Sequence, residues 1–173
     1  MQHIKDKIRT IPNFPKQGIM FRDITTLLKD PQGFQDVINA FKDRYASQKI
    51  DVVCAIEARG FIIGGALAKE LNVGFVPLRK KGKLPHKVHT VEYDLEYGKD
   101  VLEVHQDAVK QGARVLIVDD LIATGGTAKA ACDLIEKIGG KIVECAFIVD
   151  LPELKGKEKL ARPAFALVEF EGE

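Results

Sequence analysis

The chain has 173 residues, of which 46% are hydrophobic and 29% are charged, and its formal net charge is +1 at pH 7. This length and apolar content predict one globular domain over residues 1–173 with a hydrophobic core of its own. The balanced charge argues against a surface that coats nucleic acid and against a polybasic membrane anchor. No N-terminal signal-like segment and no apolar run of membrane-spanning length is found in the sequence, so we expect a cytoplasmic protein.

Three cysteines, Cys54, Cys132 and Cys145, lie in or beside apolar runs and show no C-x-x-C spacing. We interpret them as buried thiols in a reducing compartment, and neither as metal ligands nor as disulfide partners. Buried cysteines of this kind pack as small apolar side chains.

The N-terminal segment predicts a short helix followed by an irregular stretch. Ile4 and Ile8 have helical spacing, and the helix is expected to stop before Pro12. Residues 12–25, PNFPKQGIMFRDIT, contain two prolines and a glycine, which argue against regular structure there. The apolar triplet Ile19–Phe21 has two interpretations: it packs a hood against the core, or it walls a pocket for a flat ring with the phenylalanine as its face.

The following part of the chain predicts a surface helix and then a strand–loop–helix unit. Residues 31–45 have helical apolar spacing. Residues 50–56 are typical of a buried strand, which ends in the sequence EARG, and residues 61–71 are typical of a helix. Arg59 has two interpretations, an ion pair with Glu57 or another loop acid, or a fixed fork for phosphate oxygens.

A third strand is expected over residues 73–78, and four cations follow it within residues 79–83. These cations either form a solvated surface or neutralise a charged leaving group at the edge of the sheet. Residues 84–98 have poor periodicity and are expected to form a mobile lid. His86 and His89 have no third ligand at a diagnostic spacing, so a metal site is not expected there.

The most informative stretch of sequence reads VLIVDDLIATGGT. Its apolar run, Val115–Val118, predicts a strand that is buried on both faces and ends at Asp119 and Asp120. The small residues Thr124–Thr127 then lead into a helix that is expected over residues 128–138.

A small-residue loop that enters a helix N-terminus offers free backbone N–H groups and the positive end of the helix dipole, which both favour a phosphate. Many α/β proteins have such a turn without a ligand, and the acid pair is then a solvated strand end. Two carboxylates beside a phosphate would repel it unless sugar hydroxyls or a hydrated divalent cation lie between them. The combination therefore fits a ribose 5-phosphate.

Further strands are expected over residues 99–105, over residues 141–149 and, at a sheet edge, over residues 164–170. The two strand–loop–helix units should place their loops at the same edge of one parallel sheet, which predicts an α/β fold. The sequence contains neither a Walker A motif nor a G-x-G-x-x-G after a strand. These absences exclude a P-loop ATPase and an ordinary dinucleotide site.

Residues 115–127 resemble the 5-phosphoribosyl 1-diphosphate (PRPP) signature of the type I phosphoribosyltransferases. Three further stretches are similar to the members of that family that use adenine, and the resemblance covers nearly the whole chain. These stretches are residues 12–25, EARGF at 57–61, and RKKGKLP with YDLEYG between 79 and 98.

The resemblance implies an α/β fold with a parallel-sheet core flanked by helices, a small N-terminal hood over residues 1–30 and a mobile lid over residues 82–98. It implies a purine-salvage transferase that converts adenine and PRPP to AMP and diphosphate. Mg2+ is the implied cofactor, held through PRPP and water with no direct protein ligand. A homodimer is also implied, with neither nucleic acid nor a membrane as a partner.

The resemblance further assigns roles to residues that bind the sugar and its phosphates. The 5′-phosphate would be bound by Ala123, Thr124, Gly125, Gly126 and Thr127. The ribose hydroxyls would be bound by Asp119 and Asp120. Arg59 would act in catalysis by holding the diphosphate, assisted, from the same or the partner subunit, by Arg79, Lys80 and Lys83.

A second set of implied roles concerns the base. Adenine would be contacted by Met20, Phe21, Arg22 and Leu121, with the Phe21 ring stacked on one face and Arg22 acting through its main chain. Glu96 would be the catalytic acid/base that handles the proton at adenine N7, and Tyr97 in the lid would close over the site.

Two rival functions follow from the same signature. A 6-oxopurine phosphoribosyltransferase would share the PRPP loop and differ in the base pocket. A PRPP-sensing regulator would keep the fold and lack turnover, but such a protein needs a basic nucleic-acid-binding surface or an added domain. The near-neutral chain offers neither as an obvious feature, and Glu96 favours turnover.

Overall fold

The computed structural model describes residues 1–95 and 98–172. The strands are β1 (Arg9–Pro12), β2 (Met20–Asp23), β3 (Val52–Ile56), β4 (Gly74–Lys80), β5 (Val88–Leu95), β6 (Gly98–His105), β7 (Arg114–Ile122), β8 (Lys141–Asp150) and β9 (Ala164–Glu169). The helices are α1 (Gln2–Lys5), α2 (Thr25–Leu28), α3 (Pro31–Tyr45), α4 (Arg59–Leu71), α5 (Gly126–Lys137), α6 (Gly156–Leu160) and the 3-10 turn Pro152–Leu154.

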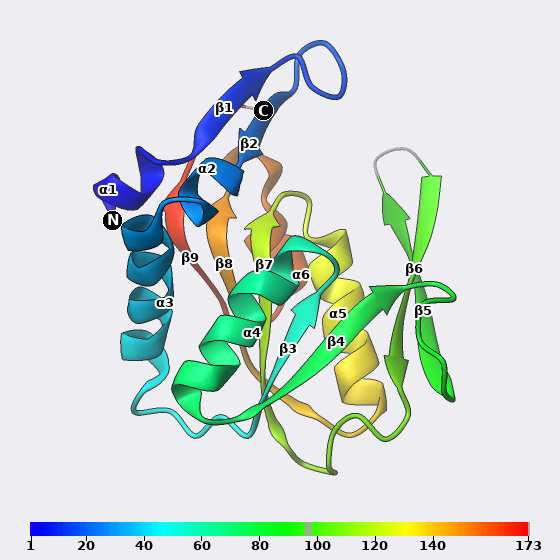
Figure 1. Ribbon diagram of the computed structural model, residues 1–173. Coiled ribbons are helices and arrows are strands. Elements are labelled where there is room, and N and C mark those ends of the chain that lie inside the picture. Colours follow the sequence, from blue (N-terminus) through cyan, green and yellow to red (C-terminus); the bar gives the residue numbers. More distant parts are fainter. Residues whose placement is uncertain (96–97, 173) are drawn as a thin grey trace.

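A seven-stranded sheet forms the centre of the molecule, in the order β5-β6-β4-β3-β7-β8-β9. The five strands from β4 to β9 in this order pair in parallel, whereas β6 pairs antiparallel with β4 and with β5. Helices α3 and α4 pack on one face of the sheet and α5 on the other (Figure 1). The predicted α/β class with a parallel core is confirmed.

The two central strands are buried because both of their faces carry helices. All five residues of β3 are buried, and so are the four residues Val115–Val118 of β7. Along β7 the side chains alternate between two cores: Leu116 and Val118 pack with α3 and α4, and Val115 and Ile117 pack with α5. Burial on both faces accounts for the continuous apolar run in the sequence.

Local signals set the ends of the helices. α3 begins after Asp30, whose carboxylate accepts a hydrogen bond from the Gly33 N–H at 2.6 Å, and Pro31 stands at its first turn. α4 ends at Asn72 in the left-handed conformation, where it closes the last turn. The helices predicted from periodicity over 31–45 and 61–71 are therefore confirmed.

The N-terminal hood differs from its prediction. α1 is a single turn ending at Lys5, and residues 9–12 and 20–23, expected to be helical or irregular, form a two-stranded antiparallel sheet. Pro12 ends its strand opposite Met20, a position at the end of a sheet where a missing N–H is tolerated. The prolines thus lie at the strand end and in the connecting loop, and the expectation of no regular structure was wrong for both strands.

One strand is longer than predicted, and another was not predicted at all. β7 continues through Asp119 and Asp120 to Ile122, since its pairing with β8 extends to Asp150. Residues 88–95, expected to belong to an irregular lid, form β5, which pairs with β6 along its whole length. Pairing with another strand, which the periodicity of a single segment does not report, decides both cases.

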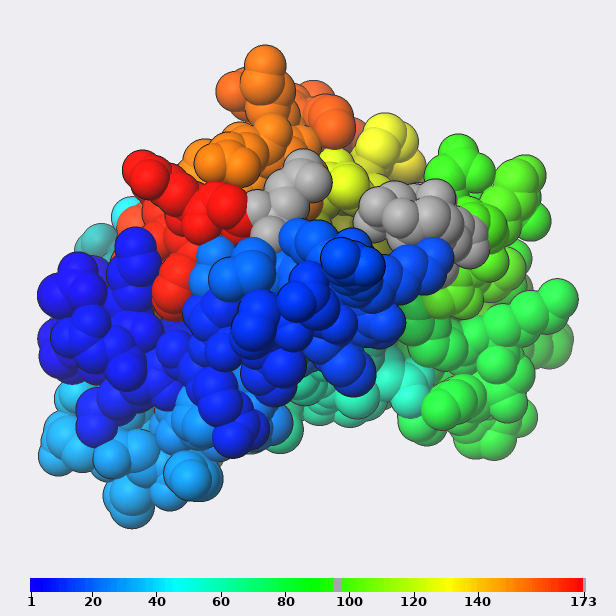
Figure 2. Space-filling model, turned by 90° about the horizontal axis from the view of Figure 1, so that it is seen from above, coloured from blue at the N-terminus to red at the C-terminus, as the bar shows by residue number. Residues whose placement is uncertain are grey.

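Among residues 1–95 and 98–172, no helix has the length and apolar character that a membrane crossing requires. The cysteines are free thiols and are buried, as predicted. Seen from above, the N-terminal residues cover the near side of the molecule, and the residues of β4 to β6 lie at the right (Figure 2).

Candidate functional site

The loops that follow β3 and β7 meet at the carboxyl ends of the parallel strands, below the hood (Figure 1). Between them lies a hollow of about 270 Å³, which we call the polar hollow. It is lined by the two loops together with Lys80 from β4 and Phe147 from β8. Such an edge is where ligands bind in open α/β sheets. The structure thus brings together the predicted residues Arg59, Lys80, Asp119, Asp120 and Ala123–Thr127.

The second loop is shaped to present backbone N–H groups. Gly125 has a φ of +83° and stands at the N-cap of α5, with no side chain capping the helix. The first N–H groups of a helix have no intrahelical partner, so those at the start of α5 are available to an anion. A Cβ on Gly125 would lie 2.5 Å from the Gly156 carbonyl oxygen, because the loop packs directly on the start of α6.

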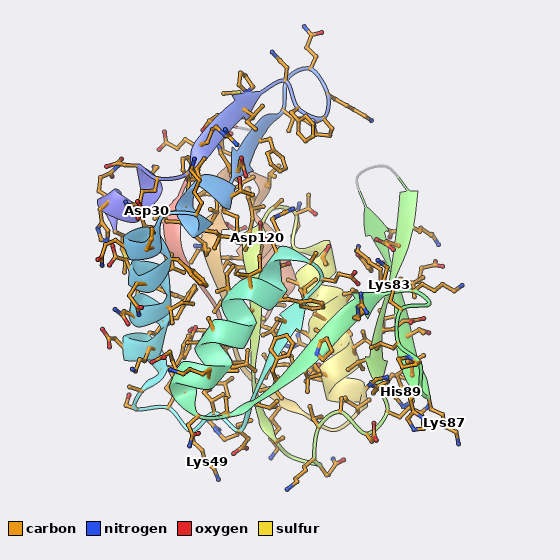
Figure 3. All side chains as sticks on the ribbon, in the orientation of Figure 1. Asp30, Lys49, Lys83, Lys87, His89 and Asp120 are labelled. Carbon is orange, nitrogen blue, oxygen red and sulfur yellow. The ribbon has the colours of Figure 1, made fainter. Side chains whose placement is uncertain are left out.

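The two acids of β7 have different surroundings. Asp120 Oδ2 accepts a hydrogen bond from Arg59 Nε at 2.5 Å, and Figure 3 shows Asp120 near the upper end of the sheet. Asp119 Oδ1 instead accepts from the Asp120 N–H at 2.9 Å. Burial, and after it the charge of Asp120, raises the pKa of Asp119 well above its usual range. Asp120 therefore supplies the carboxylate that faces a cation.

Arg59 begins α4 and takes the ion-pair interpretation, with Asp120 as its partner and not Glu57. Burial alone would lower the pKa of Arg59, but the charge and hydrogen bond of Asp120 outweigh it, and the pKa is raised. About half of the Arg59 side chain remains exposed to the hollow. Its role toward a diphosphate remains a prediction.

Gly60 is a site residue that the sequence did not single out. A Cβ there would lie 2.9 Å from Asp119 Oδ1 and 3.0 Å from the Val118 carbonyl oxygen. The first turn of α4 therefore packs against the end of β7, which holds the two loops side by side. The glycine directly after Arg59 was the available signal.

The other predicted cations are held by carboxylates. Glu57 accepts from Arg79 Nη2 at 3.2 Å and from Lys83 Nζ at 3.1 Å. Burial would raise the pKa of Glu57, but these partners and the Lys80 N–H lower it to about 2. Among Arg79, Lys80 and Lys83, only Lys80 lines the polar hollow. Arg79 and Lys83 form ion pairs with Glu57, which itself lines the hollow.

A second pocket of about 390 Å³, the apolar pocket, adjoins the polar hollow and shares Arg59, Leu121, Ala123 and Thr124 with it. Its other lining residues are Ile19, Met20, Phe21, Arg22, Leu151 and Leu154. All four residues predicted to contact a flat base line this pocket. Leu151 and Leu154 were missed, because nothing in the sequence after β8 marks them as pocket residues.

The side chain of Arg22 turns away from a ligand role. Its Nη1 donates to Thr10 Oγ1 at 2.6 Å, and its Nη2 donates to the Glu171 carbonyl oxygen at 2.9 Å. The guanidinium also lies 4.6 Å from the ring centre of Phe170. The Arg22 side chain thus joins the hood to the C-terminal segment. Only the main chain of Arg22 remains for contacts with a ligand in the pocket, which is consistent with the prediction.

Two predicted site residues, Glu96 and Tyr97, lie outside the described residues. His89 stands near the start of β5, at the lower right of Figure 3, whereas Asp120 lies near the upper end of the sheet. Within residues 1–95 and 98–172, no group of three or more His, Cys, Asp or Glu side chains is placed to hold a metal ion.

The comparisons with known proteins agree with one another. Residues 23–165 match the model of the phosphoribosyl transferase domain. The chain is 58% identical to the adenine phosphoribosyltransferase of Desulfosudis oleivorans, over 98% of this chain and 99% of that protein.

Among solved structures, that of adenine phosphoribosyltransferase from Thermoanaerobacter pseudethanolicus is 48% identical, with a TM-score of 0.95 over 98% of this chain and 99% of that chain. The Saccharomyces cerevisiae enzyme, in complex with adenine and an imino-altritol bisphosphate, is 42% identical, with a TM-score of 0.92 over 96% of this chain and 97% of that chain.

Proposed function

Because the chain belongs to the adenine phosphoribosyltransferase family, we propose that it converts adenine and PRPP to AMP and diphosphate in purine salvage. One observation carries the proposal beyond family membership. The polar hollow, with its anion-binding loop, and the apolar pocket of about 390 Å³ adjoin, and they share Arg59, Leu121, Ala123 and Thr124. A sugar phosphate in the hollow and a purine in the pocket would therefore lie side by side.

The second loop anchors the sugar in this proposal. The N–H groups from Ala123 to Thr127 bind the 5′-phosphate, and Asp119 and Asp120 bind the ribose hydroxyls. The ribose C1′–O bond breaks with its electron pair passing to the leaving diphosphate, while adenine N9 forms the new bond to C1′. The acids tolerate the positive charge that develops on the ribose.

Cations take up the charge of the diphosphate. Arg59 exchanges its partner Asp120 for the diphosphate oxygens, and Lys80, Arg79 and Lys83 add positive charge at the wall of the hollow. Stabilising charge that develops in the transition state is usually the largest electrostatic contribution of an active site.

The base is held between the hood and the end of β7. The ring centre of Phe21 lies 5.2 Å from that of Phe14, with the two rings nearly perpendicular. Phe21 stacks on one face of adenine, with Met20 and the main chain of Arg22 beside it. Leu121 lies on the other face. Glu96 accepts the proton that leaves adenine N7 as N9 bonds to C1′, and Tyr97 covers the site, two roles that rest on the family resemblance alone.

Mg2+ belongs to the proposal as a cofactor that accompanies PRPP. The carboxylates fit this arrangement, since Asp119 and Asp120 line the hollow beside the anion-binding loop. Mg2+ gives up its waters reluctantly, so these oxygens would accept hydrogen bonds from the water shell of the ion. When bound, the ion neutralises charge on the diphosphate.

The proposal includes a homodimer in the cytoplasm. Ile62 on α4 and Phe75 on β4 are large apolar side chains that remain 50% and 38% exposed in the single chain. A second copy that packs on them would bury this apolar surface. The reducing compartment rests on the sequence, in which the three cysteines lie in or beside apolar runs without C-x-x-C spacing.

A spectrophotometric assay of AMP formation from adenine, PRPP and Mg2+ tests the function. We expect turnover with adenine and far slower turnover with hypoxanthine, guanine or xanthine in competition. A preference for any of these three bases would favour a 6-oxopurine enzyme. PRPP binding without any turnover would favour a sensor.

A further inference from the structure

The β5–β6 hairpin is joined to the rest of the sheet by a short ladder. β6 pairs with β4 at two positions, Arg79 with Glu103 and Lys80 with Leu102. Above these positions β5 and β6 continue to pair with each other. Figure 1 shows this upper part standing apart from β4, on the same side of the molecule as the hood. Contacts beyond the ladder therefore decide where the upper hairpin lies.

Lys80 makes one of these contacts from within the polar hollow. Its ammonium donates to the Tyr93 hydroxyl at 2.6 Å and forms an ion pair with the Asp100 carboxylate. Tyr93 and Asp100 face each other across the hairpin, and the hydroxyl donates to the carboxylate at 3.3 Å. One side chain thus connects the hollow to both strands of the hairpin.

A second contact joins the hairpin to the loop at the start of α5. A Cβ on Gly126 would lie 3.1 Å from the main-chain oxygen of Asp94, which is next to Tyr93 in β5. The upper hairpin therefore lies against the loop that presents N–H groups to the hollow. A movement of the hairpin relative to Lys80 would therefore change its contact with that loop.

We propose that Asp100 is a positioning residue that holds Lys80 on the hairpin in competition with a diphosphate in the polar hollow, so that binding of diphosphate loosens the anchor of the hairpin. The inference rests on the proposed function in taking this hollow as the diphosphate site. The Lys80 and Asp100 side chains are 35% and 29% exposed, so an incoming anion can reach the ammonium.

Linkage fixes the size of the effect in both directions. If the Asp100 carboxylate lowers the affinity for diphosphate by a given factor, bound diphosphate weakens the Lys80–Asp100 ion pair by the same factor. A partly exposed ion pair corresponds to a factor of about two to five in binding.

Isothermal calorimetry with inorganic diphosphate at fixed Mg2+ tests the coupling. Asp100→Asn removes the charge and keeps the oxygen that accepts from the Val101 N–H at 2.8 Å. We expect this variant to bind diphosphate about two to five times more tightly than the wild type. Glu92→Gln is the matched control, since it breaks the Lys99–Glu92 pair of the same hairpin, whose side chains are 64% and 57% exposed. Its diphosphate affinity should equal that of the wild type.

Amide hydrogen exchange supplies a second readout. Diphosphate should accelerate exchange in residues 88–95 and 98–105 of the wild type, whereas in Asp100→Asn exchange should be faster already without ligand and respond less. Tyr93→Phe removes another partner of Lys80 and should shift diphosphate affinity in the same direction as Asp100→Asn, which covers the case in which that variant does not fold.

The outcomes separate this inference from the proposed function. Diphosphate affinity that is unchanged or weaker in the folded variants overturns the coupling even if the wild type forms AMP. A wild type that binds diphosphate more weakly than Asp100→Asn but forms no AMP supports the coupling and overturns the proposed function. A wild type that binds no diphosphate overturns both.

Discussion

Two strand–loop–helix units, β3 with α4 and β7 with α5, share one layout and bring different chemistry to the site. The loop after β3 carries charged side chains, Glu57 and Arg59, and α4 follows without a left-handed residue. The loop after β7 enters α5 through Gly125 with a φ of +83° and presents backbone N–H groups. The shared topology places both loops at one edge, and the residue at the turn decides whether side chain or backbone acts there.

The two units also depend on each other. Arg59 of the first pairs with Asp120 of the second, and Gly60 of the first leaves room for Asp119. Backbone geometry is fixed by packing, whereas ion pairs can be exchanged for a ligand. A substitution that displaces the backbone of the second loop should therefore have the largest effect on activity, and substitutions of the side chains that form ion pairs should have smaller effects.

The largest effect is expected for Gly125→Val. Its Cβ would collide with the Gly156 carbonyl oxygen at 2.5 Å, and its φ of +83° is strained for any branched side chain. We expect kcat/KM for PRPP to fall by about 100-fold or more, since small displacements of a binding loop have effects of that size. Steady-state kinetics and thermal unfolding measure it. Gly65→Ala in α4, where a Cβ meets open space, is the control and should retain activity.

The second largest effect is expected for Arg59→Met. It removes the guanidinium and leaves Asp120 without its ion-pair partner, so we expect kcat/KM for PRPP to fall by about 100-fold, the usual effect of losing one charge-stabilising donor. Arg59→Lys should retain only part of the wild-type kcat/KM, because the planar fork of the guanidinium is lost. Arg162→Met breaks an ion pair with Glu136 on the far end of α5 and should leave kcat/KM unchanged. Near wild-type kcat/KM for Arg59→Met would remove the arginine from the mechanism.

Asp120→Asn should have a smaller effect, which differs between the two ligands PRPP and inorganic diphosphate. Loss of charge-assisted hydrogen bonds to the ribose should weaken PRPP binding about tenfold. Inorganic diphosphate has no ribose and should bind at least as tightly as before, because Arg59 is released. Calorimetry with the two ligands measures both effects. Unchanged affinity for PRPP would contradict the ribose role.

The smallest effect is expected for Glu57→Gln, which concerns stability. The pKa of Glu57 is lowered to about 2 in the folded protein, against about 4.3 when unfolded, so its contribution is present above the unfolded pKa and is lost as pH falls toward 2. We expect the free energy of unfolding to drop by about 1 kcal/mol at pH 7.

Denaturant melts at several pH values check this expectation. The difference between the wild type and Glu57→Gln should narrow steadily below about pH 4.3. Glu92→Gln, at an exposed pair, should show no comparable difference. A gap that stays constant down to acid pH would mean that the carboxylate charge is not its cause.

Much of the molecule follows from local sequence. Continuous apolar runs identified the buried strands β3, β7 and β8, and helical spacing identified α3, α4 and α5, because burial on both faces and an amphipathic period leave direct traces in the order of residues. The paired acids and the Thr124–Thr127 turn likewise predicted a sugar-phosphate loop, since a turn that requires glycine is encoded where it occurs.

Only the tertiary structure decided features that depend on a partner segment. The strands of the hood and β5 exist because each pairs with a neighbour, in spite of prolines or weak periodicity. The partner of Arg59, the place of Leu154 in the apolar pocket and the closeness of Gly60 to Asp119 arise between segments far apart in the chain. Sequence by itself determined which chemical groups this protein carries at its loops, and folding determined which of them meet, because contacts across the sheet leave no local pattern.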